Sequence, residues 1–105
     1  MRAGQLNKRV SIERPGSAQS ETGQVVDGWS TVATVWAAIQ PLSGRELFAA
    51  QQLQARADLL VRIRYLAGVE PKMRVRFGAR LLDIQAVRNL DERNRELELF
   101  CLEQP

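Results

Sequence analysis

The sequence predicts a mainly β fold, a small β-barrel of about six or seven strands with one short helix inserted between strands. Two observations lead to this prediction. Apolar and polar residues alternate with a period of two in several short segments, as in strands that bury one face. Only one segment carries the start signals of a helix. Because open strand edges invite uncontrolled pairing, many short strands favour a closed or nearly closed barrel.

Length and composition predict one soluble domain spanning residues 1–105. Hydrophobic residues make up 45% of the chain and charged residues 26%, which is typical of globular proteins and excludes disorder of the whole chain. The net charge of +3 is too mild to indicate nucleic-acid binding by itself. Neither a signal peptide nor an apolar run of ~20 residues is evident, so we expect a protein made and used, or assembled into a particle, in a cytosol.

The strands are predicted from alternation and from turn residues. We expect them at residues 8–14, 24–29, 31–40, 58–66, 73–77, 80–88 and 96–103. Pro41 ends the third of these strands, and Gly78-Ala79 suits a two-residue hairpin turn. The parity of Trp36, Tyr65 and Phe77 predicts that all three aromatic side chains face inward.

The helix is predicted from Ser43 to about Ala55. Ser43 as N-cap and Glu46 three residues later form a capping box. The body of the helix has a thin apolar stripe and several glutamines, so we expect it to hold weakly to its own domain.

Catalytic and metal-binding chemistry is missing from the sequence. There is no histidine, which removes the commonest general base and metal ligand. The single cysteine, Cys101, alternates with leucines in a predicted strand and is expected in the core. We therefore predict no enzyme activity, no catalytic residues, no metal site and no cofactor.

Four arginines form the sharpest charge feature. Arg62 and Arg64 share one face of a strand, Arg74 and Arg76 share one face of the next, and we expect the two strands to be hairpin neighbours. Four guanidinium groups on one patch would contact phosphate or an acidic partner. The alternative is that carboxylates on adjacent strands neutralise them.

Three segments together resemble a known family. They are LNKRVSIERP at the start, VWAAIQPLSGRELFAAQQLQARA in the middle, and PKMRVRFGARLLDIQAV followed by NLDERNRELELFC. In this order they resemble the phage head–tail joining family, the head-closure or stopper proteins of long-tailed bacteriophages.

The resemblance implies a structural protein of the virion neck, between capsid and tail, assembled in the host bacterial cytoplasm. Its barrel would join a homo-oligomeric ring that closes the DNA-filled capsid below the portal and adaptor. The implied partners are other copies, the adaptor ring above, tail-terminator or tail-tube proteins below, and genomic DNA in the channel; no membrane is involved.

The resemblance also implies a channel gate at about residues 43–55. The candidate gate residues are Ser43, Glu46, Leu47, Phe48, Gln51, Gln52, Leu53 and Gln54. Neutral glutamines can line a pore or bond to neighbouring copies without gripping DNA electrostatically. Two polar loops are candidates for subunit or partner contact, and their residues are Ser17, Gln19, Glu21, Asp91, Glu92, Arg93 and Arg95.

Two other functions stay open. A nucleic-acid-binding barrel of the OB or SH3-like type would need exposed aromatic side chains beside basic groups. A tail terminator would be another ring-forming, β-rich phage protein.

Overall fold

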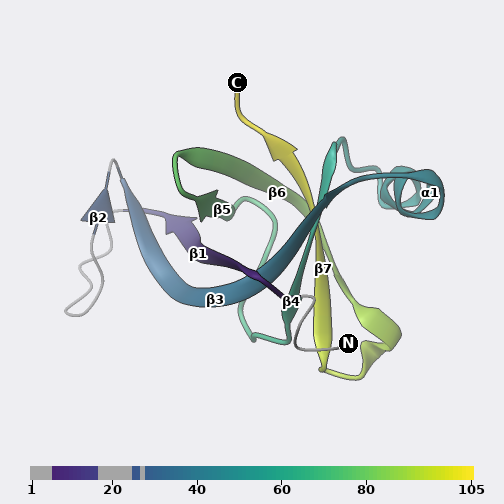
Figure 1. Ribbon diagram of the computed structural model, residues 1–105, viewed down its shortest axis with the longest axis horizontal. Coiled ribbons are helices and arrows are strands. Elements are labelled where there is room, and N and C mark those ends of the chain that lie inside the picture. The colour runs from purple at the N-terminus through teal and green to yellow at the C-terminus, as the bar shows by residue number, and fades with distance from the viewer. Residues whose placement is uncertain (1–5, 17–24, 27) are drawn as a thin grey trace.

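All described strands belong to one antiparallel sheet (Figure 1). The computed structural model describes residues 6–16, 25–26 and 28–105. The elements in chain order are β1 (Lys8–Pro15), β2 (Val25–Val26), β3 (Trp29–Pro41), α1 (Gly44–Gln52), β4 (Leu59–Arg64), β5 (Arg74–Phe77), β6 (Arg80–Asn89), the 3₁₀ turn η2 (Leu90–Glu92) and β7 (Glu96–Glu103).

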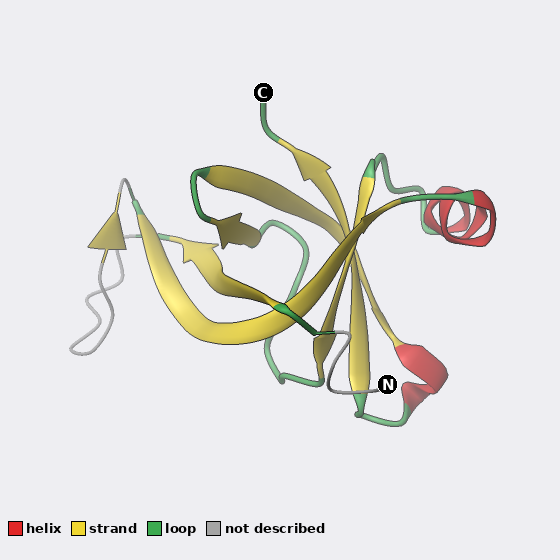
Figure 2. Cartoon of the chain, viewed as in Figure 1, coloured by secondary structure: helices red, strands yellow, loops and turns green. Residues whose placement is uncertain are grey.

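Six of the strands close into a barrel. The neighbour order is β1-β5-β6-β7-β4-β3-β2, and an additional pairing of β1 with β3 joins the two sides. Strand β2 is a short hairpin partner at the start of β3. Figure 2 shows the strands forming the wall, with α1 attached outside it. The predicted mainly β barrel with one inserted helix is confirmed.

Strand β3 is the long, curved strand that closes the barrel (Figure 1). Its first part pairs with β1 and its last part, from Ala37 to Pro41, pairs with β4. A register shift between Ile12 and Glu13 marks a bulge, a feature that bends a strand and increases its twist. The strand ends at Pro41 as predicted but begins at Trp29, so the strand predicted at 24–29 is reduced to β2.

The inner core is formed by the alternating residues of the barrel wall. Its buried members are Val10, Ile12, Ala37, Val61, Ile63, Met73, Val75, Leu82, Ile84, Leu97, Leu99 and Cys101. A second cluster, on the outer side, joins Ala50 of α1 to Leu60, Ala86 and Phe100 of the wall. Strand β7 is therefore buried on both faces, although only one of its faces was predicted to be.

Two aromatic side chains lie at the surface, contrary to the prediction from parity. Trp36 is 51% exposed and Tyr65 is 40% exposed. In β3 the inward positions are Val35, Ala37 and Ile39, which pack in or against the core. Trp36 alternates with these residues and so points outward, while Phe77 is partly buried against the core as expected.

The Cys101 thiol lies in the core with no exposed surface. Burial, and to a lesser degree the nearby carboxylates of Asp83 and Asp58, raise its pKa. Because the thiolate is the reactive form, both effects suppress its chemistry.

We predict that a thiol reagent such as DTNB labels Cys101 at least about a hundredfold more slowly in the native protein than in the chain unfolded by guanidinium chloride, since labelling must await opening of the barrel. The absorbance of the released aromatic thiol measures both rates. Similar rates in the two states would contradict a buried Cys101.

Candidate functional site

Helix α1 is the centre of the segment that the sequence singled out. Ser43 has the extended backbone of an N-cap, but its hydroxyl donates to the Glu46 carboxylate at 3.2 Å and caps no backbone N–H. Ser43 therefore does not make its side-chain-to-backbone bond of the predicted capping box, and its side chain pairs with that of Glu46 instead. The helix ends at Gln52, earlier than predicted, because Gln54 adopts a left-handed φ of 56° that terminates it.

A small contact holds α1 to the barrel. Ala50 is the buried residue of the helix, and it packs with Leu60 and Phe100 in the outer cluster. The large apolar side chains of the segment point elsewhere. Leu47 is 44% exposed, Phe48 60% and Leu53 45%. The neighbouring glutamines are exposed as well, and they are Gln51, Gln52 and Gln54. The prediction of a helix with little apolar face toward its own domain agrees with this geometry.

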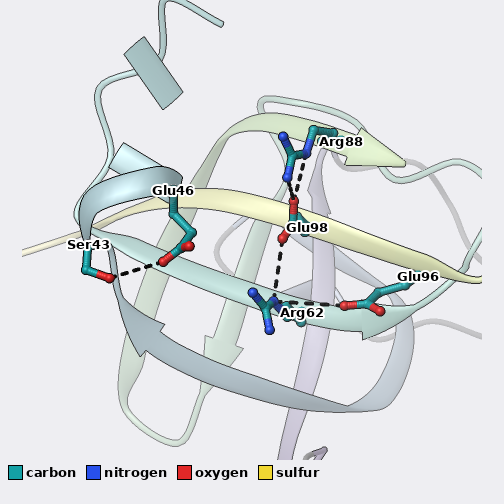
Figure 3. Close-up of polar contacts among 6 residues, drawn as sticks. All are labelled: Ser43, Glu46, Arg62, Arg88, Glu96 and Glu98. Atoms are coloured by element: carbon teal, nitrogen blue, oxygen red, sulfur yellow. Dashed lines mark hydrogen bonds and ion pairs between the residues drawn. The ribbon is translucent and has the colours of Figure 1, made fainter. Parts of the chain in front are cut away.

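A network of charged side chains lies between the start of α1 and the barrel (Figure 3). Glu98 is almost fully buried and accepts a hydrogen bond from Arg88 Nε at 2.7 Å. Arg62 Nε lies 3.5 Å from Glu98 and 3.9 Å from Glu96, and this buried nitrogen has no hydrogen bond.

A pocket of about 310 Å³ opens beside this network, and its lining residues are Arg45, Glu46, Arg62, Arg88, Leu90, Glu96 and Glu98. Three arginines face three glutamates, so charge favours neither an anion nor a cation as ligand.

The four arginines at 62, 64, 74 and 76 do not lie on neighbouring strands. Strand β4 pairs with β3 and β7, whereas β5 pairs with β1 and β6, so the expected hairpin of β4 with β5 is wrong. Three of the four are also paired with glutamates inside the chain. Arg64 is exposed at the end of β4 with no ion pair among the described residues.

A buried ion pair joins β1 to β5. Glu13 accepts a hydrogen bond from Arg74 Nε at 2.7 Å and another from Arg76 Nε at 3.0 Å. Glu13 is 4% exposed and Arg74 is 5% exposed. The Arg74 guanidinium also lies 4.1 Å from the centre of the Trp29 ring. Arg74 alternates with the core residues Met73 and Val75 as predicted, but it is covered instead of solvated, and it fastens the barrel where β1 meets the short β5.

The loop before β7 is braced by two asparagines. Asn89 donates to the Asn94 side chain at 2.7 Å and accepts from the Asn94 backbone N–H at 3.2 Å. Glu92, Arg93 and Arg95 are exposed in this loop. Of the other loop candidates, Ser17, Gln19 and Glu21 lie outside the described residues, and Asp91 belongs to η2.

The exposed Trp36 is the surface feature that sequence reasoning missed. The Arg9 guanidinium lies over its ring, 5.0 Å from the centre. A signal was present in β3, because the residues of the same parity as Trp36 include Thr34 and Gln40, whereas the opposite set is almost wholly apolar. The mixed polarity of the Trp36 set indicates the outer face.

The described part of the chain holds no group of three or more histidine, cysteine or acidic side chains able to hold a metal ion. Among the same residues, no helix has the length and apolarity needed to cross a membrane.

A solved structure is similar in fold. The solution structure of protein SF1141 from Shigella flexneri 2a superposes with a TM-score of 0.68 at 23% sequence identity, covering 98% of this chain and 96% of that one. No curated protein matches the sequence. The family profile described as phage head completion protein matches residues 1–104.

The match to that profile covers nearly the whole barrel, including α1 and the loop before β7. It agrees with the resemblance carried by the three sequence segments. Such proteins are structural virion components that interact with other head and tail proteins. This chain therefore belongs to the phage head completion protein family and has a structural role in closing the phage head.

Proposed function

We propose that this chain is a ring subunit of the phage neck, which closes the DNA-filled capsid below the portal and adaptor and forms the surface to which the tail docks. The residues 43–55 act as the gate of the DNA channel. The observation that carries the proposal is the exposure of Leu47 and Phe48 on a helix that buries a single alanine, and of Leu53 directly after it.

Exposed apolar side chains on a loosely held helix favour contact with neighbouring copies. Each large apolar side chain removed from water contributes about 1.5–3 kcal/mol. A ring repeats this contact between every pair of subunits, so modest interactions together resist the outward push of packaged DNA. The exposed glutamines add hydrogen bonds without strong electrostatic attraction to DNA.

Movement of the gate requires that α1 can leave its position without unfolding the barrel. The inner core contains no residue of α1, and the outer cluster includes only Ala50 as a buried helix residue. Opening would then be a switch of α1 between two packings.

The direct test mixes the protein with DNA-filled heads that carry portal and adaptor but lack this chain. Retention of DNA inside the heads, measured as protection from added nuclease, should rise when the protein is added. Retention that stays the same with and without the wild-type protein would count against the connector function.

We predict that replacing both Leu47 and Phe48 with serine leaves the barrel folded but speeds DNA leakage by roughly tenfold or more, since apolar contacts between subunits are lost. Val32, an exposed apolar residue of β3, provides the matched control as Val32→Ser. Leakage equal to wild type in the double variant would exclude these side chains from the gate.

A further inference from the structure

A row of three residues crosses the outer surface of the barrel, and we call it the Trp36 row. Arg9 on β1 pairs in register with Trp36 on β3. The pairing of β3 with β4 ends at Ala37 and Ile63, and Trp36 and Arg64 are the next residues beyond this pair on the two antiparallel strands. Ala37 and Ile63 face the core, and the alternation of strands turns all three members of the row outward.

The two cations of the row have no carboxylate partner among the described residues. The arginines at 62, 74, 76, 80 and 88 each pair with a glutamate of this chain. No such pair is formed by Arg9 or Arg64 in the described part of the chain. Glu96, which pairs in register with Arg64, lies near the Arg62 guanidinium instead. The row is therefore positively charged and complementary to carboxylates.

Two further exposed residues lie near the end of β4. Tyr65 follows Arg64 and is 40% exposed, and its backbone N–H donates to the Arg95 carbonyl at 3.0 Å, which brings the exposed Arg95 into the same region. Tryptophan, tyrosine and arginine are the residues most enriched among those that dominate the binding energy of protein interfaces.

The geometry favours a protein over a nucleic acid as occupant. One face of the Trp36 ring is already covered by the Arg9 guanidinium at 5.0 Å, which removes that face as a stacking platform for a base. Along β3 the row is flanked by the uncharged Thr34 and Ala38, not by the run of cations that a phosphate backbone requires. The other face of the Trp36 ring instead offers a flat, rigid apolar surface between the cations of Arg9 and Arg64.

We propose that the Trp36 row is the docking surface for an acidic segment of another protein of the phage neck or tail, with an apolar side chain seated on Trp36 and carboxylates paired with Arg9 and Arg64. The proposal relies on the proposed function for the identity of the particles that carry this partner. It assigns a task to residues that lie outside the gate segment of residues 43–55.

The test measures binding of fluorescently labelled protein to DNA-filled heads carrying portal and adaptor, and to purified tails, by co-sedimentation. We expect Trp36→Ala and Arg64→Glu each to weaken binding to one of these particles by roughly tenfold or more. Arg56→Glu is the matched control for Arg64→Glu. Arg56 is also exposed and lies outside the row, and the two substitutions change the net charge equally. Near-ultraviolet circular dichroism verifies that the variants are folded.

Each other outcome has a defined meaning. Wild-type protein that binds neither heads nor tails contradicts the proposed function itself. Wild-type binding that both row variants retain to within about twofold overturns the docking surface while leaving the proposed function intact. Two further results would also overturn it: row variants that lose only salt-sensitive binding to a short DNA duplex, which would assign the row to DNA, or row variants that lose only self-association in analytical ultracentrifugation, which would assign it to a second copy.

Discussion

Replacing Glu13 with alanine should destabilise the barrel by about 3–5 kcal/mol, the usual cost of leaving a buried charge unpaired. Glu13 accepts hydrogen bonds from both Arg74 and Arg76, and Arg74 is 5% exposed. Without the carboxylate, the Arg74 guanidinium would be held away from water against the Trp29 ring and would lose the acceptor of its hydrogen bond. A domain of this size is typically stable by about 5–15 kcal/mol, so the loss is a large fraction of the total.

Urea denaturation followed by tryptophan fluorescence measures this change in the free energy of unfolding. The matched control is Glu103→Ala, which removes another arginine-paired glutamate, one that accepts from Arg80 at 2.8 and 2.9 Å at the exposed end of β7. Its ion pair is solvated and screened, so a much smaller loss is expected. Equal losses in the two variants would mean that burial does not set the importance of the Glu13 pair.

The Arg80 hydrogen bond lowers the pKa of Glu103. A carboxylate with a lowered folded pKa contributes its stability above the unfolded pKa and loses it as the pH falls through the folded value. The Arg80–Glu103 pair should therefore persist into mildly acidic solution, and the Glu103 control is best compared with wild type at neutral pH.

Replacing Phe100 with alanine should destabilise the protein by about 3–5 kcal/mol through lost burial and the cavity left behind. Phe100 has no exposed surface and is the largest fully buried side chain of the barrel. It lies on the outer face of β7, where it packs with Leu60, Ala86 and Ala50 beneath α1. The same truncation should also loosen α1, because its buried contact would lose its largest partner.

Phe48→Ala is the matched control, since Phe48 is 60% exposed on α1 and its removal should change stability by less than about 0.5 kcal/mol. Urea unfolding measures both variants, and amide hydrogen exchange in α1 measures the loosening. Fast exchange in α1 of the Phe100 variant with slow exchange in the inner strands is expected. Uniform exchange across both would show that α1 and the barrel open as one unit.

Together these two variants separate the barrel from the gate. Glu13 joins β1 to β5, two strands that are far apart in the sequence, whereas Phe100 supports the contact between the barrel and α1. A Phe100 variant that still folds but seals heads poorly would connect the packing of α1 with the proposed gating, and it would do so without altering any exposed side chain of α1.

The local pattern of the sequence was enough to predict most strands. Alternation placed β4, β6 and β7 within one or two residues of their observed bounds, and the Gly78-Ala79 turn joins β5 to β6 as predicted, with a φ of 61° at Gly78. These features depend on neighbours in the chain, which is why periodicity and turn chemistry report them. The family was likewise evident from the joint occurrence of its segments.

The pairing of strands could not be obtained in the same way. Consecutive strands β4 and β5 were expected to be neighbours, but the barrel closes by placing β7 and β3 beside β4. Which strands meet depends on closure of the whole sheet, a global property with no local signature. As a result, carboxylates from distant strands neutralise Arg62, Arg74 and Arg76, while Arg64 stays available.

Periodicity and capping residues thus determined the class of fold and the inserted helix, because both are encoded within a few neighbouring residues. The composition of the whole chain excluded histidine chemistry. Only the tertiary structure decided that Phe100 is covered by α1, that Glu13 is buried with Arg74, and that the Arg9 guanidinium stacks on the Trp36 ring. The physical reason is that burial of a side chain depends on which distant segments pack over it, and alternation distinguishes the two faces of a strand without saying what covers either one.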